Sequence, residues 1–404
     1  MSVNDMTFNQ IAAVLQSVVN QATGVSVLTP TNTSEFVTVA QTALKTGYDP
    51  ILNAISQVLS RTIFSIRPYY RKFGGIEVSE SAWGNMVRKL SIADKNFQND
   101  ARYAYPVGYD GTQTPASGDG KSVDMYTINK PDVLQTNFYG ANVFSDCYTV
   151  FKDQLECAFQ SPDGFASFLA MVQQNQVDKL EQARENIARA TVVNFIGGII
   201  AEGQTSRIVH LLTEYNAATG LTLTAQSIYQ PANYAPFMQW VYARIAGISA
   251  MMTERSEMYQ TVVNGKHIMR HTPVDRQHVY LYAGERYNTE AMVLADTYHD
   301  NYLRYVGDVE TVNFWQSIET PGTINVTPGY IGSTGEIVTP AEAVNQGNVY
   351  GVIFDGEALG YATTQQWSQP TPFNAKGGYT NIWTHETERN WNDHTEKGVV
   401  LLLD

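Results

Sequence analysis

The stretch SPDGFASFLAMVQQNQVDKLEQARENIARATVVNFIGG, residues 161–198, decides the fold. It begins with a serine, a proline and an acid, the order of residues that favours the first turn of a helix. One apolar stripe, which includes Phe165, Val172 and Ile187, continues at helical spacing to the glycine pair at 197–198. The pattern predicts a helix of about 35 residues, roughly 50 Å long at about 1.5 Å per residue. It has no heptad repeat of large apolar residues, so we expect a spine that supports a sheet and not a coiled coil.

The segment before the spine predicts an extended β-hairpin at residues 67–141. Its first arm is polar, aromatic and roughly alternating, which is typical of strands. The run PVGYDGTQTPASGDGKS, residues 106–122, has the composition of a loop tip, and a second strand-like run follows from Met125 to Leu134. Such a hairpin has too few apolar residues to bury by itself, so we expect it to lie on something else. Between the hairpin and the spine, the apolar spacing predicts a short helix over residues 145–160.

The two ends of the chain predict further helices and strands. Residues 1–66 indicate short helices, one ending at Gly24, one at Gly47 and one beginning at Asp49. The remaining segments alternate between strand and helix patterns, which indicates a mixed module, and we assign the chain to the α+β class. These segments are a helix at 235–256, strands at 278–284 and 349–356, a helix at 285–298 and long closing strands at 379–403.

Charged residues are scarce and unevenly distributed. They make up 16% of the chain, against about 25% in a typical soluble domain. The apolar content excludes a disordered chain, and the net charge of −13 argues against a protein that grips nucleic acid. Surfaces that are short of charge and rich in aromatic residues are often buried against partners.

The basic residues gather on the predicted hairpin. Residues 67–105 hold seven Lys or Arg against four Asp or Glu, a net +3 that leaves −16 for the rest of the chain. A basic arm on an acidic body suits a contact between subunits, since opposite fields steer association and fix register. A solvated hairpin with scattered charges is the alternative. The predicted intersubunit contacts are Arg71, Lys72, Phe73, Trp83, Arg88 and Lys89.

No arrangement of residues predicts catalysis. Gly120, Lys121 and Ser122 match the end of a phosphate-binding loop, but Pro115 stands where its first glycine belongs. The motif HIMRH, residues 267–271, lacks the glutamate of a zinc helix, so we interpret its histidines, with His278, as polar loop residues. We therefore predict no catalytic, cofactor-binding or metal site and do not expect an enzyme.

Three further features have ordinary interpretations. The residues His385, Glu386, Glu388, Asp393 and His394 are typical of the solvated face of alternating strands. Cys147 and Cys157 lack metal-ligand spacing, and we expect two buried free thiols. No apolar run approaches the roughly 20 residues of a membrane helix, and the first basic residue is Lys45, so we expect neither a membrane span nor a signal peptide.

Two stretches resemble the major capsid proteins of tailed, double-stranded DNA phages, in particular the small podovirus branch. They are KPDVLQTNFYGANVFSDCYTVFKDQLECAFQSPDGFASFLA, residues 130–170, and NVYGVIFDGEALGYATT, residues 348–364. The resemblance implies the capsid fold of that family, divided into four parts. The parts are a helical N-terminal arm at 1–66, an extended β-hairpin loop at 67–141, a peripheral domain with the spine helix at 142–205 and 372–404, and an axial domain at 206–371.

The resemblance also implies a function. Subunits of this family form pentamers and hexamers that close into an icosahedral shell around phage double-stranded DNA, without sequence-specific binding. It implies no cofactor, a place in the virion, assembly in the host bacterial cytoplasm, and scaffolding, portal and head-decoration proteins as candidate partners. Two alternatives stay open at this point: an encapsulin-like compartment, and a carbohydrate-active hydrolase suggested by six Trp, 24 Tyr and the carboxylates.

Overall fold

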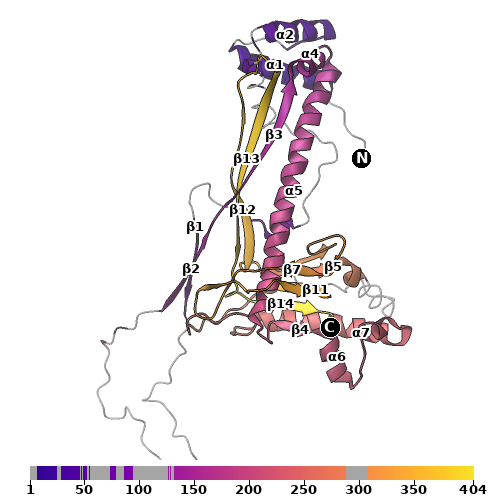
Figure 1. Cartoon of the computed structure of the whole chain (residues 1–404), viewed down its shortest axis with the longest axis vertical. Coiled ribbons are helices and arrows are strands. Elements are labelled where there is room, and N and C mark those ends of the chain that lie inside the picture. Colours follow the sequence, from indigo (N-terminus) through magenta and orange to yellow (C-terminus); the bar gives the residue numbers. More distant parts are fainter. Residues whose placement is uncertain are drawn as a thin grey trace, which may run out of the picture.

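The protein is an elongated molecule built along one helix, with a small helical cap at one end and a larger body at the other (Figure 1). The computed structural model describes residues 7–24, 29–45, 47, 49–51, 54, 73–78, 86–93, 126, 128, 132–287 and 308–404. The predicted hairpin tip at 106–122 lies outside the described residues. So do most residues of the two predicted helices that begin at Asp49 and at residue 285. Within the described part, no helix is both long enough and apolar enough to cross a membrane.

The long helix is α5 (Pro162–Glu202), and it confirms the predicted spine. The side chain of Ser161 accepts a hydrogen bond from the backbone N–H of Gly164 at 3.0 Å, and Pro162 occupies the first turn. The helix passes the glycine pair and ends at Gly203, whose positive φ of 70° suits a left-handed cap.

Three helices form the cap at the first turns of α5. These are α1 (Phe8–Thr23), α2 (Thr33–Lys45) and α4 (Lys152–Ala158). Their apolar faces meet in one cluster, in which the Phe165 ring lies 5.1 Å from that of Phe159 and 6.1 Å from that of Phe36. Gly24 ends α1, so the first two predicted helices are confirmed.

The predicted helix at 145–160 is wrong in its first half. Residues Asn142–Phe151 form the strand β3, and only α4 is helical. β3 pairs antiparallel with β13 (Tyr379–Asn392), from Phe151 opposite Tyr379 to Asn142 opposite Glu388. The alternation of this segment therefore matches a partner strand more than 200 residues away, which helical spacing within the segment cannot reveal.

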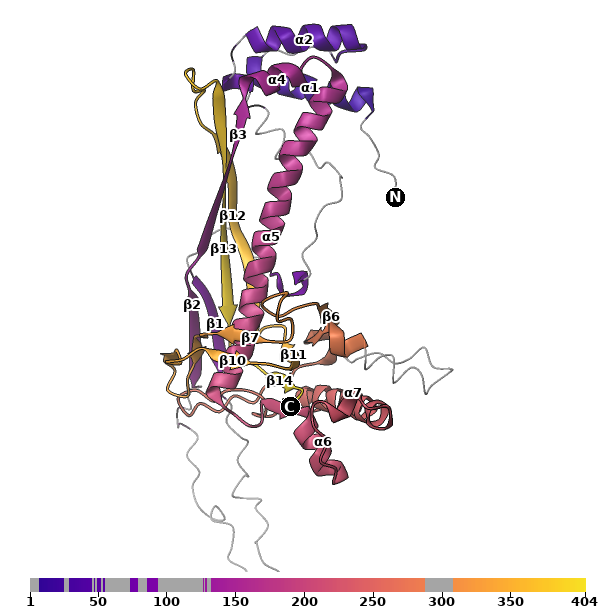
Figure 2. The same cartoon turned by 45° about the vertical axis from the view of Figure 1, so that its right-hand side comes forward.

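A three-stranded sheet, in the order β12-β13-β3, runs along α5 and is called the spine sheet below (Figure 2). Its edge strand β12 spans Leu359–Pro370. Alternate residues of β13, such as Ile382 and Thr384, are buried on the side of α5, and the intervening residues form the outer face.

The body is a five-stranded sheet between two layers of helix. Its order is β4 (Ile208–His210), β14 (Gly398–Leu402), β11 (Val349–Asp355), β5 (Gln277–Tyr282) and β6 (Asp308–Val312). Val352, Phe354, Val400 and Leu402 pack with the C-terminal half of α5, whereas Ile353, Val399 and Leu401 pack with α7 (Pro231–Thr253) on the other face. The buried strands predicted at 278–284 and 349–356 are confirmed.

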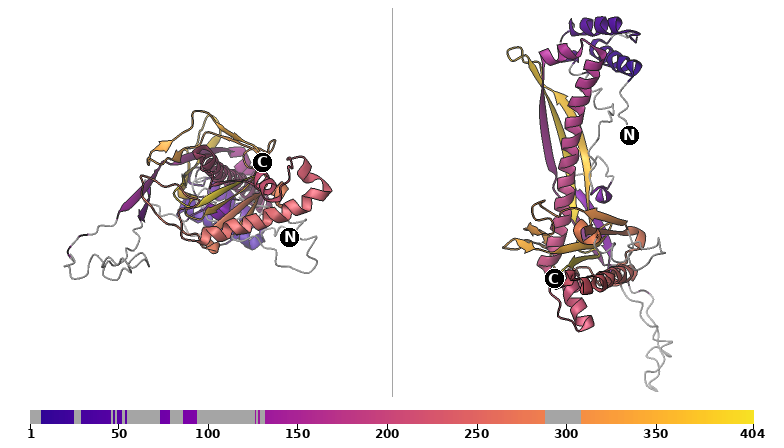
Figure 3. Two further views of the ribbon diagram at one scale, coloured as in Figure 1. Left: turned by 90° about the horizontal axis from the view of Figure 1, so that it is seen from below. Right: turned by 90° about the vertical axis from the view of Figure 1, so that its right-hand side faces the viewer.

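Shorter elements complete the body (Figure 3). The helix α6 (Leu211–Thr219) packs beside α7, and two small antiparallel pairs lie near the end of α5. The pairs are β7 (Ile324–Val326) with β10 (Val344–Gln346) and β8 (Tyr330–Ile331) with β9 (Ile337–Val338). The 3-10 turns are η1 (Gly74–Ile76), η2 (Ser227–Tyr229) and η3 (Val274–Arg276).

The arms of the predicted hairpin are present as β1 (Met86–Ile92) and β2 (Val133–Tyr139), which pair antiparallel beside the body (Figure 2). Gly140, with a φ of +105°, separates β2 from β3. Glycine adopts this backbone conformation without the steric cost that other residues meet, so the chain can leave the hairpin and enter the spine sheet within two residues.

The predicted domain boundaries remain predictions, but the strand pairing bears on them. β12 precedes residue 372 and pairs with β13, while β14 follows it and pairs with β11. The closing strands predicted at 379–403 are therefore two strands of two different sheets, joined by the loop 393–397.

Candidate functional site

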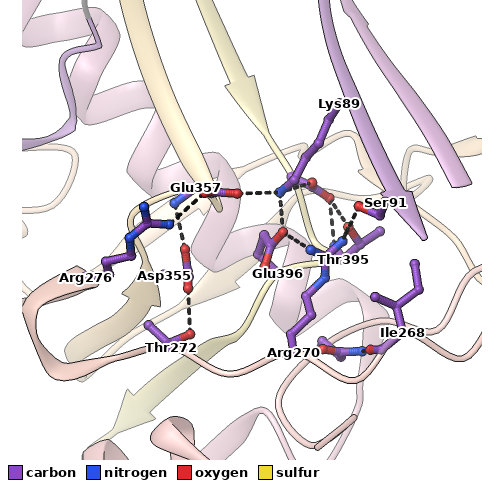
Figure 4. A network of polar contacts seen from close by, with 12 residues as sticks. Lys89, Ser91, Ile268, Arg270, Thr272, Arg276, Asp355, Glu357, Thr395 and Glu396 are labelled. Atoms are coloured by element: carbon purple, nitrogen blue, oxygen red, sulfur yellow. Dashed lines mark hydrogen bonds and ion pairs between the residues drawn. The ribbon is translucent and has the colours of Figure 1, made fainter. Parts of the chain in front are cut away.

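A cluster of charged side chains lies where the hairpin meets the loop between β13 and β14 (Figure 4). The loop residues 393–397 are all buried, with exposed fractions of 0–5%. We call Lys89, Arg270, Asp393, Thr395 and Glu396 the charged junction. It connects β1 of the hairpin with the corner between the spine sheet and the body.

Lys89 is the contribution of the hairpin. Its Nζ lies 3.0 Å from Oδ2 of Asp393, contacts Oε1 of Glu396 and lies 3.7 Å from Oε2 of Glu357. The Lys89 side chain is 18% exposed, and the Asp393 side chain is fully buried. A buried carboxylate needs such a partner, because an isolated charge is very unfavourable away from water.

Arg270 also connects the loop 393–397 to strand β1 of the hairpin. Its guanidinium pairs with Glu396 and donates hydrogen bonds to the hydroxyls of Ser91 at 3.0 Å and Thr395 at 3.2 Å. Asp393 is held in place by the backbone N–H and the hydroxyl of Thr395, at 2.9 and 2.6 Å. Lys89 and Ser91 lie on the same face of β1, so this face is anchored by polar contacts at two successive positions.

The electrostatics of the junction combine burial and pairing. Burial opposes the charged forms of Lys89 and Asp393, but the combined effect of their partners outweighs it. Asp393 and Glu396 together raise the pKa of Lys89, and Lys89 together with the hydrogen bonds from Thr395 lowers the pKa of Asp393. At Glu396 burial dominates and raises the pKa to about 7, although Lys89 and Arg270 favour its carboxylate. The charged form is therefore favoured at Lys89 but disfavoured at Glu396. At Glu396 the ion pairs do not make up for the hydration that the carboxylate loses on burial.

More buried charges lie along the axis between α5 and the closing strands. Arg184 of α5 contacts Glu386 and lies 3.4 Å from Glu388, both on the inner face of β13. Arg207 is fully buried and donates to Glu202 at 3.0 Å and to the hydroxyl of Thr261 at 2.8 Å. Burial lowers the pKa of Arg207 to about 10, even though Glu202 favours its charged form.

The interpretation of residues 385–394 as a solvated face is wrong. Glu386, Glu388, Asp393 and His394 are buried, and only His385 of this group lies on the outer face. The alternation is real, but the face that carries the carboxylates packs on α5, where Arg184 compensates them. A basic residue, Arg184, on the side of α5 that packs against this strand is a signal in the sequence from which buried acids could have been inferred.

Of the six residues predicted for intersubunit contacts, the three that the structure describes, Phe73, Arg88 and Lys89, are not brought together. Arg71, Lys72 and Trp83 lie outside the described residues. Phe73 is buried in its own body, where its N–H donates to Glu185 at 3.3 Å, and Lys89 belongs to the charged junction. Arg88 is exposed on the opposite face of β1. Contact of these residues with a neighbour stays a prediction.

The outward face of the hairpin exposes large apolar side chains. Leu90 is 62% exposed, Ile92 64% and Tyr139 73%, and Val133 lies beside Ile92 in the paired strand. Arg88 lies on the same face as Leu90 and Ile92. We call these five residues the hairpin outer face.

The outer face of the spine sheet is also uncovered. Trp367 and Trp383 are 45% and 39% exposed, and the Trp367 ring stacks on that of His385 at 4.1 Å. The side of β13 from Asn381 to Thr387, with the residues of β3 and β12 paired with it, carries no Asp, Glu, Lys or Arg. Its residues are Val143, Ser145, Cys147, Thr149, Gln365, Trp367, Gln369, Asn381, Trp383, His385 and Thr387. The next position on the same side of β13 is Arg389, which is buried.

The histidines and cysteines that the sequence analysis singled out do not form a reactive or metal-binding site in the part of the chain that the structure describes. The ring of His267 contacts Glu257 at 2.8 Å, and His278 stacks on Phe354 within the body, so His278 is a strand residue and not a loop residue. Cys147 is half-buried and Cys157 exposed, so the expectation of two buried thiols is wrong. Among the described residues, no group of three His, Cys, Asp or Glu could hold a metal ion.

Comparison with solved structures identifies the fold. The chain is similar to a chain of the capsid of Staphylococcus phage Andhra, with a TM-score of 0.55 and 12% identity over 85% of this chain and 87% of that chain. A chain from the structure of the head fibre and inner core protein gp22 of bacteriophage P68 gives a TM-score of 0.50 and 10% identity, over 85% of this chain and 87% of that one. The predicted α+β capsid fold is confirmed.

A search of curated protein sequences finds no match. A family model does match, that of the Phi29-like phage major capsid protein, over residues 11–401. Neither the encapsulin-like compartment nor the hydrolase is supported by these findings. The chain therefore belongs to the Phi29-like phage major capsid protein family, and it is a structural subunit of a multi-subunit virion capsid and not an enzyme.

Proposed function

We propose that this major capsid protein assembles as pentamers and hexamers into a closed icosahedral shell around phage double-stranded DNA. Each subunit lays its hairpin outer face on the spine sheet of a neighbour. Folding and assembly take place in the host bacterial cytoplasm, with scaffolding, portal and head-decoration proteins as candidate partners.

The observation that carries this proposal is the pair of uncovered faces on one subunit. The hairpin outer face exposes Leu90, Ile92 and Tyr139, and a two-stranded hairpin is at best marginally stable alone in water. A contiguous exposed apolar face on a folded protein typically marks an interaction site. We infer that the surface that covers it in the shell comes from another chain.

The outer face of the spine sheet suits that role. It is extended, it carries no Asp, Glu, Lys or Arg between Asn381 and Thr387 of β13 or at the residues paired with them, and Trp367 and Trp383 supply large aromatic surface. Aromatic residues are enriched and charged residues depleted at the centres of protein interfaces. When the hairpin outer face binds such a surface, the desolvation free energy is small, because few charged groups lose their hydration.

The charge distribution fits a container. The chain has a net charge of −13, and an acidic subunit repels the phosphate backbone. We infer that the shell encloses DNA without sequence-specific contacts.

The test is a double substitution on the hairpin, Leu90→Glu with Ile92→Glu. Both side chains are exposed in the subunit, so the variant should have the same unfolding temperature as the wild-type subunit. It should nevertheless fail to form shells, because assembly would bury two carboxylates at the interface. Particle yield by electron microscopy and subunit stability by calorimetry are measured together. Ile318→Glu, at a position that is 76% exposed and lies in neither face, is the control and should assemble normally. Normal shells from the double variant would contradict the proposal.

A further inference from the structure

We propose that Lys89 is a positioning residue, which fixes the hairpin on its own subunit before any neighbour arrives, while Arg88 next to it faces the neighbour. The consequence for assembly rests on the proposed function. The positioning itself does not, because every contact that carries it lies within one chain.

The two basic residues lie on opposite faces of β1. Arg88 is exposed, as are Leu90 and Ile92, and Lys89 and Ser91 face the body. Successive side chains of a strand point to opposite sides, so adjacent positions divide between outside and inside. The basic character of the hairpin, which the sequence presents as one feature, therefore serves two separate contacts.

The loop 393–397 presents two buried carboxyl groups, those of Asp393 and Glu396, to the ammonium group of Lys89. Asp393 is fully buried, and its Oδ2 lies 3.0 Å from Nζ of Lys89. Glu396 has a side chain that is 5% exposed and contacts the same ammonium group. If Lys89 left to pair with a neighbour, Asp393 would lose its nearest cation while still buried, which is strongly unfavourable.

Other polar contacts place the hairpin in the same position. Arg270 donates to Ser91 at 3.0 Å, two residues beyond Lys89 on β1. On β2, the Lys266 ammonium lies 2.9 Å from Asp132 and donates to the carbonyl of Val133 at 2.5 Å. Both strands of the hairpin base are thus held by cations and their partners.

The hairpin needs this fixing because of how it joins the spine sheet. Gly140 has a φ of +105°, and a Cβ built on it would meet no atom within 4 Å, so the link between the hairpin and the spine sheet is open on that side. Side-chain contacts at the base therefore set its direction. Their acceptors, Asp393 and Glu396, lie in the loop that joins β13 to β14, so the hairpin is positioned relative to both sheets at once.

The test is hydrogen–deuterium exchange on the unassembled full-length subunit. Lys89→Gln should raise the exchange rates of the paired β1 and β2 amides at least tenfold, because the strands move away from the body and fray. Arg88→Gln is the matched control at the adjacent position and should leave these rates within twofold of wild type. Lys89→Arg should restore most of the protection, because a guanidinium can still pair with Asp393 and Glu396.

Wild-type exchange rates in Lys89→Gln, or the same increase in Arg88→Gln, would overturn the assignment. If Lys89→Gln does not fold, Glu396→Gln removes one acceptor with little change of shape and is judged by the same criterion. Shell formation is scored separately: Arg88→Gln should lower shell yield most at low salt, where a charge contact with the neighbour is least screened, and the difference from wild type should shrink at high salt. Normal shells from Arg88→Gln would count against the proposed intersubunit contact and leave the exchange result on Lys89 untouched.

Discussion

His394 shows how a single residue links the packing of this protein to pH. Its ring is buried, stacks on Phe195 at 4.9 Å and lies 6.2 Å from the ring of Tyr330. Burial, reinforced by the charge of Arg207, lowers its pKa to about 3, and the attraction of Asp393 does not compensate. The imidazole is therefore neutral in the folded subunit. In the unfolded chain it binds a proton near pH 6.5, so its contribution to stability is complete above that pH and is lost as pH falls toward 3.

Glu396 acts in the opposite direction. Its pKa of about 7 in the folded subunit is above the ordinary value, so the folded state binds a proton that the unfolded state releases between about pH 4.5 and 7. Its contribution to stability therefore rises as pH falls through this window. The two groups, two positions apart in one loop, offset one another in mild acid.

We predict that His394→Gln removes one side of this balance. At pH 7.5 the variant is less stable than wild type because the stacked ring is lost. On going to pH 4.5 its free energy of unfolding should gain about 2–3 kcal/mol relative to wild type, since the unfolded variant no longer takes up the proton. Urea denaturation of both proteins at the two pH values measures the difference. A difference that stays constant across this range would show that His394 is not buried in its neutral form.

At this scale the sequence predicted apolar positions better than charged ones. Phe165 and Ile187 are buried as their spacing indicates. The carboxylates of Glu386 and Asp393 were assigned to solvent because a lone acid on a strand is usually solvated. Their partners, Arg184 and Lys89, are about 200 and 300 positions away in the chain, and only the fold brings them together.

Among the elements, α5 combines an apolar stripe with a point of very close packing. A Cβ added to Gly198 would lie 2.5 Å from Cε1 of His394, and one added to Gly197 would lie 2.6 Å from Cγ1 of Val326. The glycine pair therefore lets the loop 393–397 and β7 approach the helix. In the sequence this pair suggested only a place where the helix could end.

We predict opposite effects of alanine at two helical glycines. Gly198→Ala should lower the free energy of unfolding by about 1–3 kcal/mol, because the added methyl group collides with the buried His394 ring. Gly247→Ala in α7 should raise it by about 0.5–1 kcal/mol, because a Cβ there meets no atom within 4 Å and alanine favours helix. Chemical denaturation of the subunit compares the two variants. Stabilisation by both would mean that α5 does not pack closely on this loop.

The elements that could be predicted were those whose signal is local. The spine helix and the first two N-terminal helices have stripes and end signals within their own residues, and the structure confirms them. β3 was not predicted as a strand, because its hydrogen-bonding partner is β13, which lies far along the chain. The two closing strands were predicted as strands, but their separation into two sheets depends on the buried loop 393–397 and leaves no local pattern.

On the scale of the whole molecule, the scarcity of charge has a structural explanation. Several charges are paired inside the subunit, at Arg184, Arg207 and the charged junction, and the outer face of the spine sheet carries no charged residue between Asn381 and Thr387 of β13 or at the positions paired with them. The resemblance to tailed-phage capsid proteins, carried by residues 130–170 and 348–364, predicted the family and its capsid fold correctly. The charged junction could not be predicted, because Lys89 and Glu396 are 307 positions apart.

The most direct test of the assembly mechanism is a cryo-electron microscopy reconstruction of the particles that the full chain forms. It should show a closed icosahedral shell of pentamers and hexamers. In this shell, the face that carries Leu90 and Ile92 covers Trp367 and Trp383 of the adjacent subunit, and Lys89 remains on its own Asp393. A shell in which the hairpin outer face stays exposed to solvent, or in which Lys89 pairs with the neighbour, would contradict the account.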